Sequence, residues 1–138
     1  MTASLETEAI DRPLMRGIAM TGRKTLGDNE RKAVKSLLGA LDPFTDIRAT
    51  MPLQYVRTFL LVALDEGKGV AEYAAKAGVS VSVMSRHLLD IGERNRHMEK
   101  GFGLITYRPN PTELRKHEVF LTDTGRALVH RIVRNWEK

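Results

Sequence analysis

The spacing of hydrophobic residues predicts a chain built mainly from helices. After Asp28, valine and leucine recur three and four positions apart, which is the period of one face of an α-helix. We expect these residues to form one buried stripe: Val34, Leu37, Leu38 and Leu41. Asp28 or Asn29 is a suitable N-cap, and the Asp42–Pro43 pair is expected to end the helix, because a proline disfavours helical geometry at the residue before it.

A second amphipathic helix is predicted from Pro52, which suits a first helical turn, to about Gly67, a typical C-terminal glycine. One side of this helix is expected to be lined by Leu53, Val56, Leu60 and Leu64. Phe59, Leu61 and Ala63 widen the apolar face, which indicates a central position in the fold.

A short helix over residues 70–77, a turn at Gly78 and a further helix from about Ser82 come next. The further helix has an apolar side, predicted to be core, with Val81, Met84, Leu88 and Ile91. Its opposite side carries Ser82, Ser85, Arg86, Leu89 and Glu93. Ser80 or Ser82 is expected to cap it. This helix therefore combines a core face with a small, hydrogen-bonding outer face.

The hydrophobic period then changes to two, which predicts strands over residues 104–108 and 118–122. The loop between them contains Arg115 and Lys116, so the segment is predicted to be a β-hairpin with a basic tip. Thr122 is expected to cap a last helix. The apolar side of that helix is expected to comprise Leu128, Val129, Ile132, Val133 and Trp136.

This order of elements predicts a mainly α fold with a small β-hairpin wing (α+β), the winged helix-turn-helix. A helix fits the major groove of DNA, where the base edges are distinguishable, and a basic hairpin reaches the neighbouring minor groove. We expect residues 28–138 to form this domain. Residues 1–27 form an N-terminal arm, which is either loose or ordered only against a partner subunit.

Charge and composition agree with a cytoplasmic protein that has a polyanionic partner. The 22 Lys and Arg residues exceed the 17 Asp and Glu residues, so the formal charge is +5. The chain has no cysteine, which excludes disulfides and thiolate metal sites and is typical of a reducing compartment. No apolar run approaches the length of a membrane span, and the acidic N-terminal stretch is unlike a signal peptide.

Two segments resemble MarR-type winged-helix transcriptional regulators. The sequence YAAKAGVSVSVMSRHL is similar to their helix-turn-helix, and ELRKHEVFLTDTGRAL is similar to their wing and the helix that follows. In that family the wing carries an acidic residue and an arginine two positions on, then a strand ending in Leu-Thr and, after two residues, Gly-Arg. Here these positions are Glu113, Arg115, Leu121, Thr122, Gly125 and Arg126.

The resemblance implies a homodimer held by N- and C-terminal helices, with two recognition helices in successive major grooves. It places Ser82, Ser85 and Arg86 on the recognition helix and makes Arg115 the minor-groove arginine at the wing tip. The chain departs from the family in the long basic loop over residues 92–103 and in its short C-terminal portion. The full set of expected DNA contacts is Ser80, Ser82, Ser85, Arg86, Arg94, Arg96, Arg108, Arg115 and Lys116.

Other interpretations of these residues stay open. Arg86 is also placed to pair with Asp90 one helical turn on, and the basic loop and the wing tip are also interpretable as solvated surface. The histidines lack HExxH-type spacing, so neither a metal nor any other cofactor is expected. No pattern supports a small-molecule effector, and no arrangement of residues suggests an enzyme.

The function predicted from the sequence is sequence-specific binding of double-stranded DNA by a homodimeric transcriptional regulator, acting as a repressor. One alternative is a winged-helix protein of a mobile element or chromosome, serving replication, packaging or organisation with little sequence preference. Another is a winged helix that binds proteins and not DNA.

Overall fold

The structure is a computed structural model that describes residues 25–93, 99–113 and 116–136. The chain divides into two compact units, Met1–Lys35 and Ser36–Lys138. Helix α2 (Asp28–Ile47) begins in the first unit and continues into the second.

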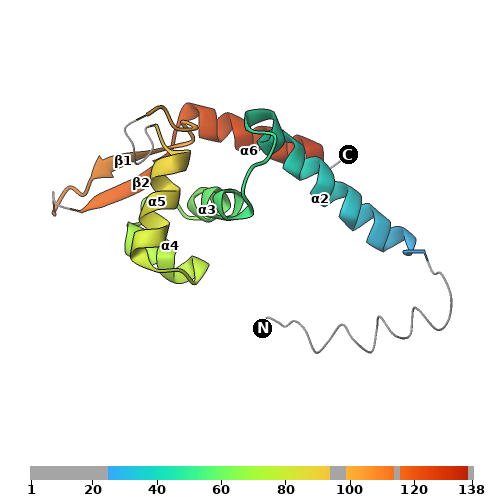
Figure 1. Cartoon of the computed structure of the whole chain (residues 1–138), viewed down its shortest axis with the longest axis horizontal. Helices are drawn as coiled ribbons and strands as arrows, with labels where there is room; N and C mark the ends of the chain where they lie inside the picture. Colours follow the sequence, from blue (N-terminus) through green and yellow to red (C-terminus); the bar gives the residue numbers. More distant parts are fainter. Residues whose placement is uncertain (1–24, 94–98, 114–115, 137–138) are drawn as a thin grey trace. The chain divides into compact units, whose positions relative to one another are not determined.

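The second unit continues with α3 (Leu53–Leu64), α4 (Val70–Ala77) and α5 (Val81–Ile91). Strands β1 (Ile105–Pro109) and β2 (His117–Leu121) follow, and helix α6 (Asp123–Trp136) ends the described chain (Figure 1). This order confirms the predicted winged helix-turn-helix. The strand limits differ from the predicted ones by one residue.

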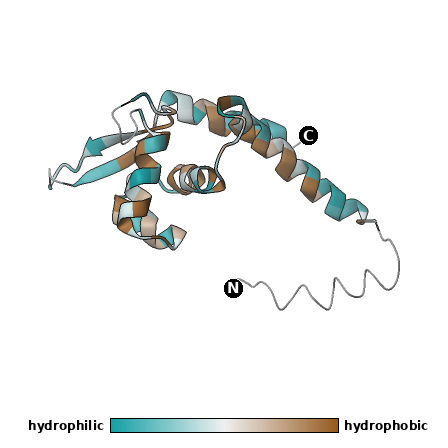
Figure 2. Ribbon diagram, in the orientation of Figure 1, coloured by the Kyte–Doolittle hydropathy of each residue, from teal (hydrophilic) through white to brown (hydrophobic). Residues whose placement is uncertain are grey.

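The core lies where α3, α4, α5 and the hairpin meet, and hydrophobic and hydrophilic residues alternate along these elements (Figure 2). Its largest fully buried side chains include Tyr73, Phe59, Met84, Leu88 and Ile91. Phe44 of α2 packs edge-on against Phe59 of α3, with ring centroids 5.8 Å apart. A buried Leu or Phe contributes about 1.5–3 kcal/mol relative to an exposed one, so this cluster is the main stabilising feature.

Helix α2 does not end at Pro43, contrary to the prediction, but continues to Ile47. Pro43 and Phe44 are buried, so packing holds this turn helical against the local preference. Proline has no N–H, and the carbonyl of Gly39, four residues earlier, therefore loses its helical donor. The side-chain amide of Asn135 on α6 donates to that carbonyl at 3.1 Å. A tertiary contact thus replaces the hydrogen bond that Pro43 removes.

The close approach of α2 and α6 at this point favours glycine at position 39, because a side chain there would need the helices to move apart by a few tenths of an ångström. A Cβ atom there would lie 3.0 Å from the backbone oxygen of Asn135. Arg131 of α6 also forms an ion pair with Asp46 of α2. These contacts hold α2, near the start of the second unit, against α6, near its end.

Several apolar stripes predicted to be buried are exposed. Val34, Leu37 and Leu38 on α2 are 53–63% exposed, and the buried residues of this helix are Ala40, Pro43 and Phe44. On α3, Val56, Phe59 and Val62 are buried, whereas Leu53, Leu60 and Leu64 are exposed. Val81, Val133 and Trp136 are also exposed. The prediction that these stripes face the core is therefore wrong, because the side of α3 that packs on the core carries Val56, Phe59 and Val62.

The antiparallel hairpin pairs Ile105 with Leu121 and Arg108 with Glu118. Side chains alternate along each strand, so Ile105, Tyr107, Val119 and Leu121 share the face that packs on the core. The segment after α3 extends the pairing on the far side of β2, because Gly67 N–H donates to Val119 O at 2.8 Å and Val119 N–H donates to Lys68 O at 3.0 Å. The carboxylate of Glu66 accepts from Leu121 N–H at 2.8 Å and from Arg126 at 3.0 Å.

The hairpin and α6 are joined by a tight corner at Thr122, which caps the last helix as predicted. The Thr122 hydroxyl accepts from Gly125 N–H at 3.0 Å and donates to Gly103 O at 2.5 Å. Gly125 is buried, and a Cβ there would lie far inside the contact distance of the Leu104 carbonyl oxygen. The Thr-x-x-Gly spacing is therefore needed for the first turn of α6 to pass over the start of β1.

We expect Gly125→Ala to lower the free energy of unfolding by about 1–3 kcal/mol, because the added methyl group cannot be accommodated without moving Leu104. Denaturant unfolding of the purified protein measures this change. Thr124→Ala is the matched control, since Thr124 is exposed in the same turn and its replacement is expected to change stability by less than about 0.5 kcal/mol. Equal effects of the two substitutions would contradict the close-packing explanation.

Candidate nucleic-acid interface

Helices α4 and α5 form a helix-turn-helix whose turn is fixed by glycine and serine. Gly78 ends α4 in the left-handed region, at φ 73°, which glycine adopts without strain. The hydroxyl of Ser80 accepts from Val83 N–H at 3.2 Å and caps α5, as predicted. Ser82 lies 3.2 Å from Ser80 through their hydroxyl oxygens, so both serines lie at the exposed start of α5.

The two sides of α5 differ as predicted. Met84, Leu88 and Ile91 are fully buried, whereas Ser82 and Arg86 are exposed and Ser85 is half-buried. Val81 departs from the prediction because it is 53% exposed at the end of the helix, beyond the reach of the core. The outer face of α5 thus presents hydroxyl groups and one guanidinium.

The proposed local pair between Arg86 and Asp90 is not formed. Arg86 makes no hydrogen bond or ion pair within the described part of the chain. The carboxylate of Asp90 instead accepts a 2.6 Å hydrogen bond from the hydroxyl of Tyr55 on α3. The ring of Tyr55 also packs edge-on against His87 and Phe102, with centroids 5.5 Å and 6.2 Å away.

The energies of the two possible interactions explain why Asp90 accepts a hydrogen bond from Tyr55 and does not pair with Arg86. An exposed ion pair one helical turn apart contributes about 0.2–0.5 kcal/mol. A hydrogen bond to a charged group contributes about 1.5–3 kcal/mol, and 2.6 Å lies in the short range of O–H···O⁻ bonds. The ring contacts of Tyr55 hold its hydroxyl in place, so the bond costs little further side-chain entropy. The guanidinium of Arg86 is therefore available to another anion.

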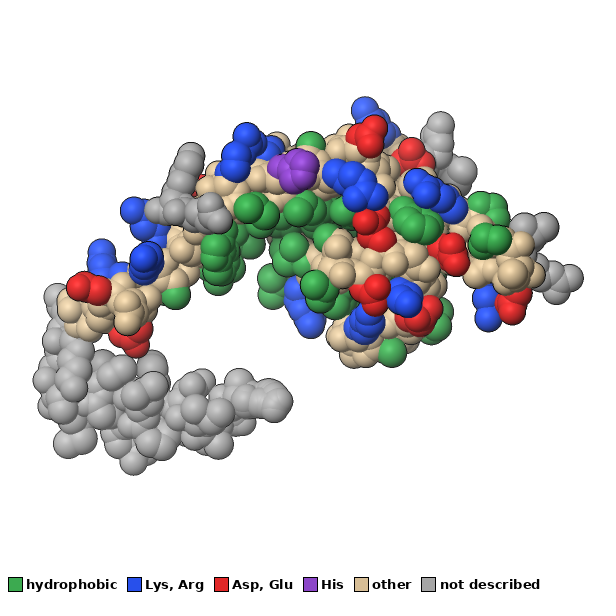
Figure 3. All heavy atoms as spheres, turned by 180° about the vertical axis from the view of Figure 1, so that it is seen from behind, with side chains coloured by type: hydrophobic (Ala, Val, Ile, Leu, Met, Phe, Trp, Pro, Cys, Tyr) green, Lys and Arg blue, Asp and Glu red, His purple; other side chains and the backbone are tan. Residues whose placement is uncertain are grey.

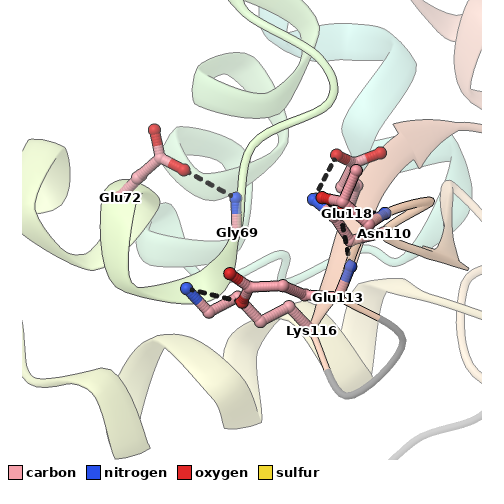
Figure 4. Close-up of polar contacts among 7 residues, drawn as sticks. Gly69, Glu72, Asn110, Glu113, Lys116 and Glu118 are labelled. Atoms are coloured by element: carbon pink, nitrogen blue, oxygen red, sulfur yellow. Dashed lines mark hydrogen bonds and ion pairs between the residues drawn. The ribbon is translucent and has the colours of Figure 1, made fainter.

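The described part of the wing turn is built on Asn110 (Figure 4). The Asn110 side-chain oxygen accepts from the backbone N–H groups of Thr112 and Glu113 at 2.9 and 3.0 Å, and its amide donates to Glu118 at 3.0 Å. The backbone N–H of Asn110 donates to Lys116 O at 2.8 Å, which closes the turn. An asparagine side chain that bonds the backbone two and three residues on is a common means of fixing a tight turn.

Two predicted contact residues lie in different surroundings on this wing. Lys116 is exposed and pairs with Glu113 at 3.2 Å, a pair that contributes little at a solvated surface. Arg108 lies with its Cζ atom 4.4 Å from the centroid of the Phe120 ring. Because side chains alternate along a strand, Arg108 and Phe120 occupy the hairpin face opposite Tyr107. Arg108 is therefore separated from the outer face of α5 by the hairpin.

A cleft of about 720 Å³ lies between the start of α4, the outer side of α5 and the wing. Its lining includes Val70, Ser85, Leu89, Tyr107, Lys116 and His117. Burial raises the pKa of the Tyr107 phenol to about 12, so this side chain stays neutral at physiological pH. Glu72, at the rim, accepts from Gly69 N–H at 3.2 Å and so completes the start of α4 (Figure 4).

Other charges close to the helix-turn-helix are occupied in structural contacts. Lys76 of α4 donates to Asp65 at 2.9 Å, and this hydrogen bond holds the pKa of the Asp65 carboxyl below its usual value. The hydroxyl of the buried Tyr73 donates to the backbone oxygen of Asp65 at 2.7 Å. These contacts stabilise the junction of α3 with α4 and leave Arg86 as the cation on the outer face of α5.

The structure brings some of the predicted site residues together. Ser80, Ser82, Ser85 and Arg86 share the start and outer face of α5, and Lys116 lies across the cleft. Arg94, Arg96 and Arg115 lie outside the described residues. The sequence reasoning did not identify Tyr55 or Asn110. The Asn-Pro pair at Asn110 is a turn signal that would have indicated its position, whereas nothing local links Tyr55 to Asp90, 35 residues away.

The described ranges contain neither a metal-binding group nor a membrane-spanning helix. No group of three His, Asp or Glu residues there is placed to hold a metal ion. Among the helices in those ranges, none combines the length and the apolar character needed to cross a membrane.

The structure was compared with known proteins. The sequence matches no protein-family model and no curated protein. Among solved structures, the transcriptional regulator Tm0710 of Thermotoga maritima matches with a TM-score of 0.59 and 15% identity over 94% of this chain and 75% of that chain. A MarR-like regulator of the same organism, Tm0816, matches with a TM-score of 0.54 and 21% identity over 82% of this chain and 77% of that chain.

A mutant MarR of E. coli, in a complex with operator DNA, matches with a TM-score of 0.55 and 18% identity over 94% of this chain and 79% of that chain. The chain has the MarR-type winged-helix fold. Helix α5 is the second helix of the helix-turn-helix, and β1 and β2 form the wing.

We expect Asn110→Ala to loosen the wing turn without unfolding the domain. Amide hydrogen exchange at Thr112 and Glu113 should become faster, because both N–H groups lose their acceptor, while exchange in α3 and α5 stays unchanged. Asn110→Asp combined with Glu118→Gln is the matched control, because it keeps that acceptor oxygen and lets the glutamine amide donate where the Asn110 amide donated, and it should retain the protection of both amides. Unchanged exchange in Asn110→Ala would show that the side chain does not hold this turn.

Proposed function

We propose that this protein is a sequence-specific double-stranded DNA-binding transcriptional regulator that acts as a homodimer and represses by occupying a promoter. The observation that carries this proposal is the outer face of α5. It joins a serine-capped start to an exposed Arg86 that pairs with no residue in the described ranges, and the wing lies across a cleft from it. This arrangement suits a helix in the major groove with a hairpin over the adjacent backbone.

Solved structures with the same fold support the choice of ligand. The mutant MarR of E. coli is complexed with operator DNA, and the transcriptional repressor CouR, with a TM-score of 0.51 and 20% identity, is bound to a 23-mer DNA duplex. The net charge of +5 favours a polyanion. Acidic residues such as Glu113 and Glu118 stand beside Lys116 on the wing, so charge alone does not account for the binding proposed here.

The exposed apolar residues support the homodimer. Leu37, Leu38, Val133 and Trp136 are each about half or more exposed on α2 and α6, the elements that flank the winged helix. Hydrophobic side chains reach the surface in a group on the face seen in Figure 3. Burying apolar surface contributes about 25 cal/mol per Å², and a second copy related by a two-fold axis would cover such faces on both chains.

DNA binding is tested by selection of bound duplexes from a random pool, followed by titration of the selected duplex. Enrichment of an inverted repeat with half-sites about one helical turn apart is expected for a dimeric, site-specific regulator. On that duplex, Arg86→Ala should cost about 1–3 kcal/mol of binding free energy and relax the sequence preference. Lys116→Ala should weaken binding to all sequences alike and reduce the salt slope by about 1.

Thr45→Ala, on an exposed part of α2 outside the proposed interface, is the control for these substitutions and should bind as wild type. Retention of DNA without any enriched sequence would instead favour an architectural or replication role. Absence of binding at low salt would contradict every DNA-binding function.

The homodimer is tested by sedimentation equilibrium. Leu38→Glu is expected to shift the protein from dimer to monomer, because it places a charge in the apolar surface that the partner would cover. Lys32→Glu, exposed on another side of the same helix, should leave the dimer intact. A monomeric wild-type protein, or a dimeric Leu38→Glu variant, would show that α2 does not form the interface.

A further inference from the structure

We infer that Tyr55 is a positioning residue for DNA recognition, which acts by holding Asp90 away from Arg86. This inference rests on the proposed function. Tyr55 lies on α3 and Arg86 on α5, and their connection is the carboxylate of Asp90. No DNA contact by Tyr55 itself is needed.

Asp90 has two possible partners, Arg86 on its own helix and Tyr55 on α3. Arg86 and Asp90 are four residues apart on α5, so their side chains are neighbours on the helix surface. Asp90 is half-buried and accepts the 2.6 Å hydrogen bond from the Tyr55 hydroxyl, whereas Arg86 is exposed and forms no ion pair within the described ranges. The Tyr55 hydroxyl holds Oδ2 of Asp90, and in this position the carboxylate forms no ion pair with Arg86.

Two consequences favour an anionic ligand at Arg86. The guanidinium does not have to break an ion pair before it contacts a phosphate or a base edge. The negative charge of Asp90 is also directed toward α3, where the phenol hydroxyl partly neutralises it, and it repels an approaching phosphate less. The rings of His87 and Phe102 pack against Tyr55, so the hydroxyl is held in place before any DNA arrives.

The arrangement also predicts what a substitution would do. Removal of the hydroxyl in Tyr55→Phe leaves the ring contacts in place but frees the carboxylate to turn toward Arg86. Since Asp90 then competes with DNA for the same guanidinium, the affinity for the selected duplex should fall about 1.4- to 2.3-fold. The melting temperature should fall slightly, which by itself would not distinguish positioning from a structural role.

A set of double variants makes that distinction. In Tyr55→Phe combined with Asp90→Asn, affinity should return to or above the wild-type value, because asparagine carries no charge to compete for Arg86. In an Arg86→Ala background, Tyr55→Phe should have no further effect, since the two changes act on one interaction. A tyrosine that only supported the fold would weaken binding in both backgrounds.

A measurement without DNA separates this inference from the proposed function. In the free protein, the NMR signal of the Arg86 Nε–H group should shift in Tyr55→Phe and return to its wild-type position when Asp90→Asn is added. If wild type binds no duplex, the proposed function fails, and this shift still decides whether Tyr55 controls the pairing of Arg86. An unshifted signal, or a loss of affinity that persists in the Arg86→Ala background, would overturn the inference.

Discussion

The backbone of Leu104 is the point on which the winged helix depends. Its N–H donates to Ile91 O at the end of α5, at 2.8 Å, and its carbonyl accepts from Thr122 N–H at 3.1 Å. The first turn of α6 passes directly over that carbonyl, at Gly125. Helix α5, the hairpin and the last helix therefore meet at one residue. The orientation of the wing relative to α5 follows from this junction more than from the contacts of the wing itself.

The elements with strong local signals could be predicted from the sequence. Gly78 and Ser80 mark the turn and the cap of the helix-turn-helix, and Thr122 marks the start of α6, because each residue has a backbone role that its own chemistry defines. The end of α2 could not be predicted in this way. Pro43 is helical because Asn135, far along the chain, supplies the donor that proline lacks, and no local rule contains that information.

The exposed leucines show a second limit of sequence reasoning. Periodicity identifies an apolar face and does not say whether the same chain or another molecule covers it. Leu60 and Leu64 follow the pattern of a core helix, yet Val56 and Phe59 occupy the buried side of α3.

Arg86 shows a third limit. The helix spacing favours its pairing with Asp90, but one hydrogen bond from a residue on another helix is stronger than that preference.

The two ends of the loop between α5 and β1 lie next to each other. Gly101 N–H donates to Glu93 O at 3.0 Å, and Gly103 N–H donates to Gly92 O at 2.8 Å, so the two ends are fastened together by backbone bonds that do not depend on the intervening side chains. Each doubling of a closed loop costs only about 0.6 kcal/mol. The stability of the domain therefore depends little on the number of residues in this loop. A peptide tag or a small reporter domain could be inserted here beside α5 while the winged helix keeps its fold.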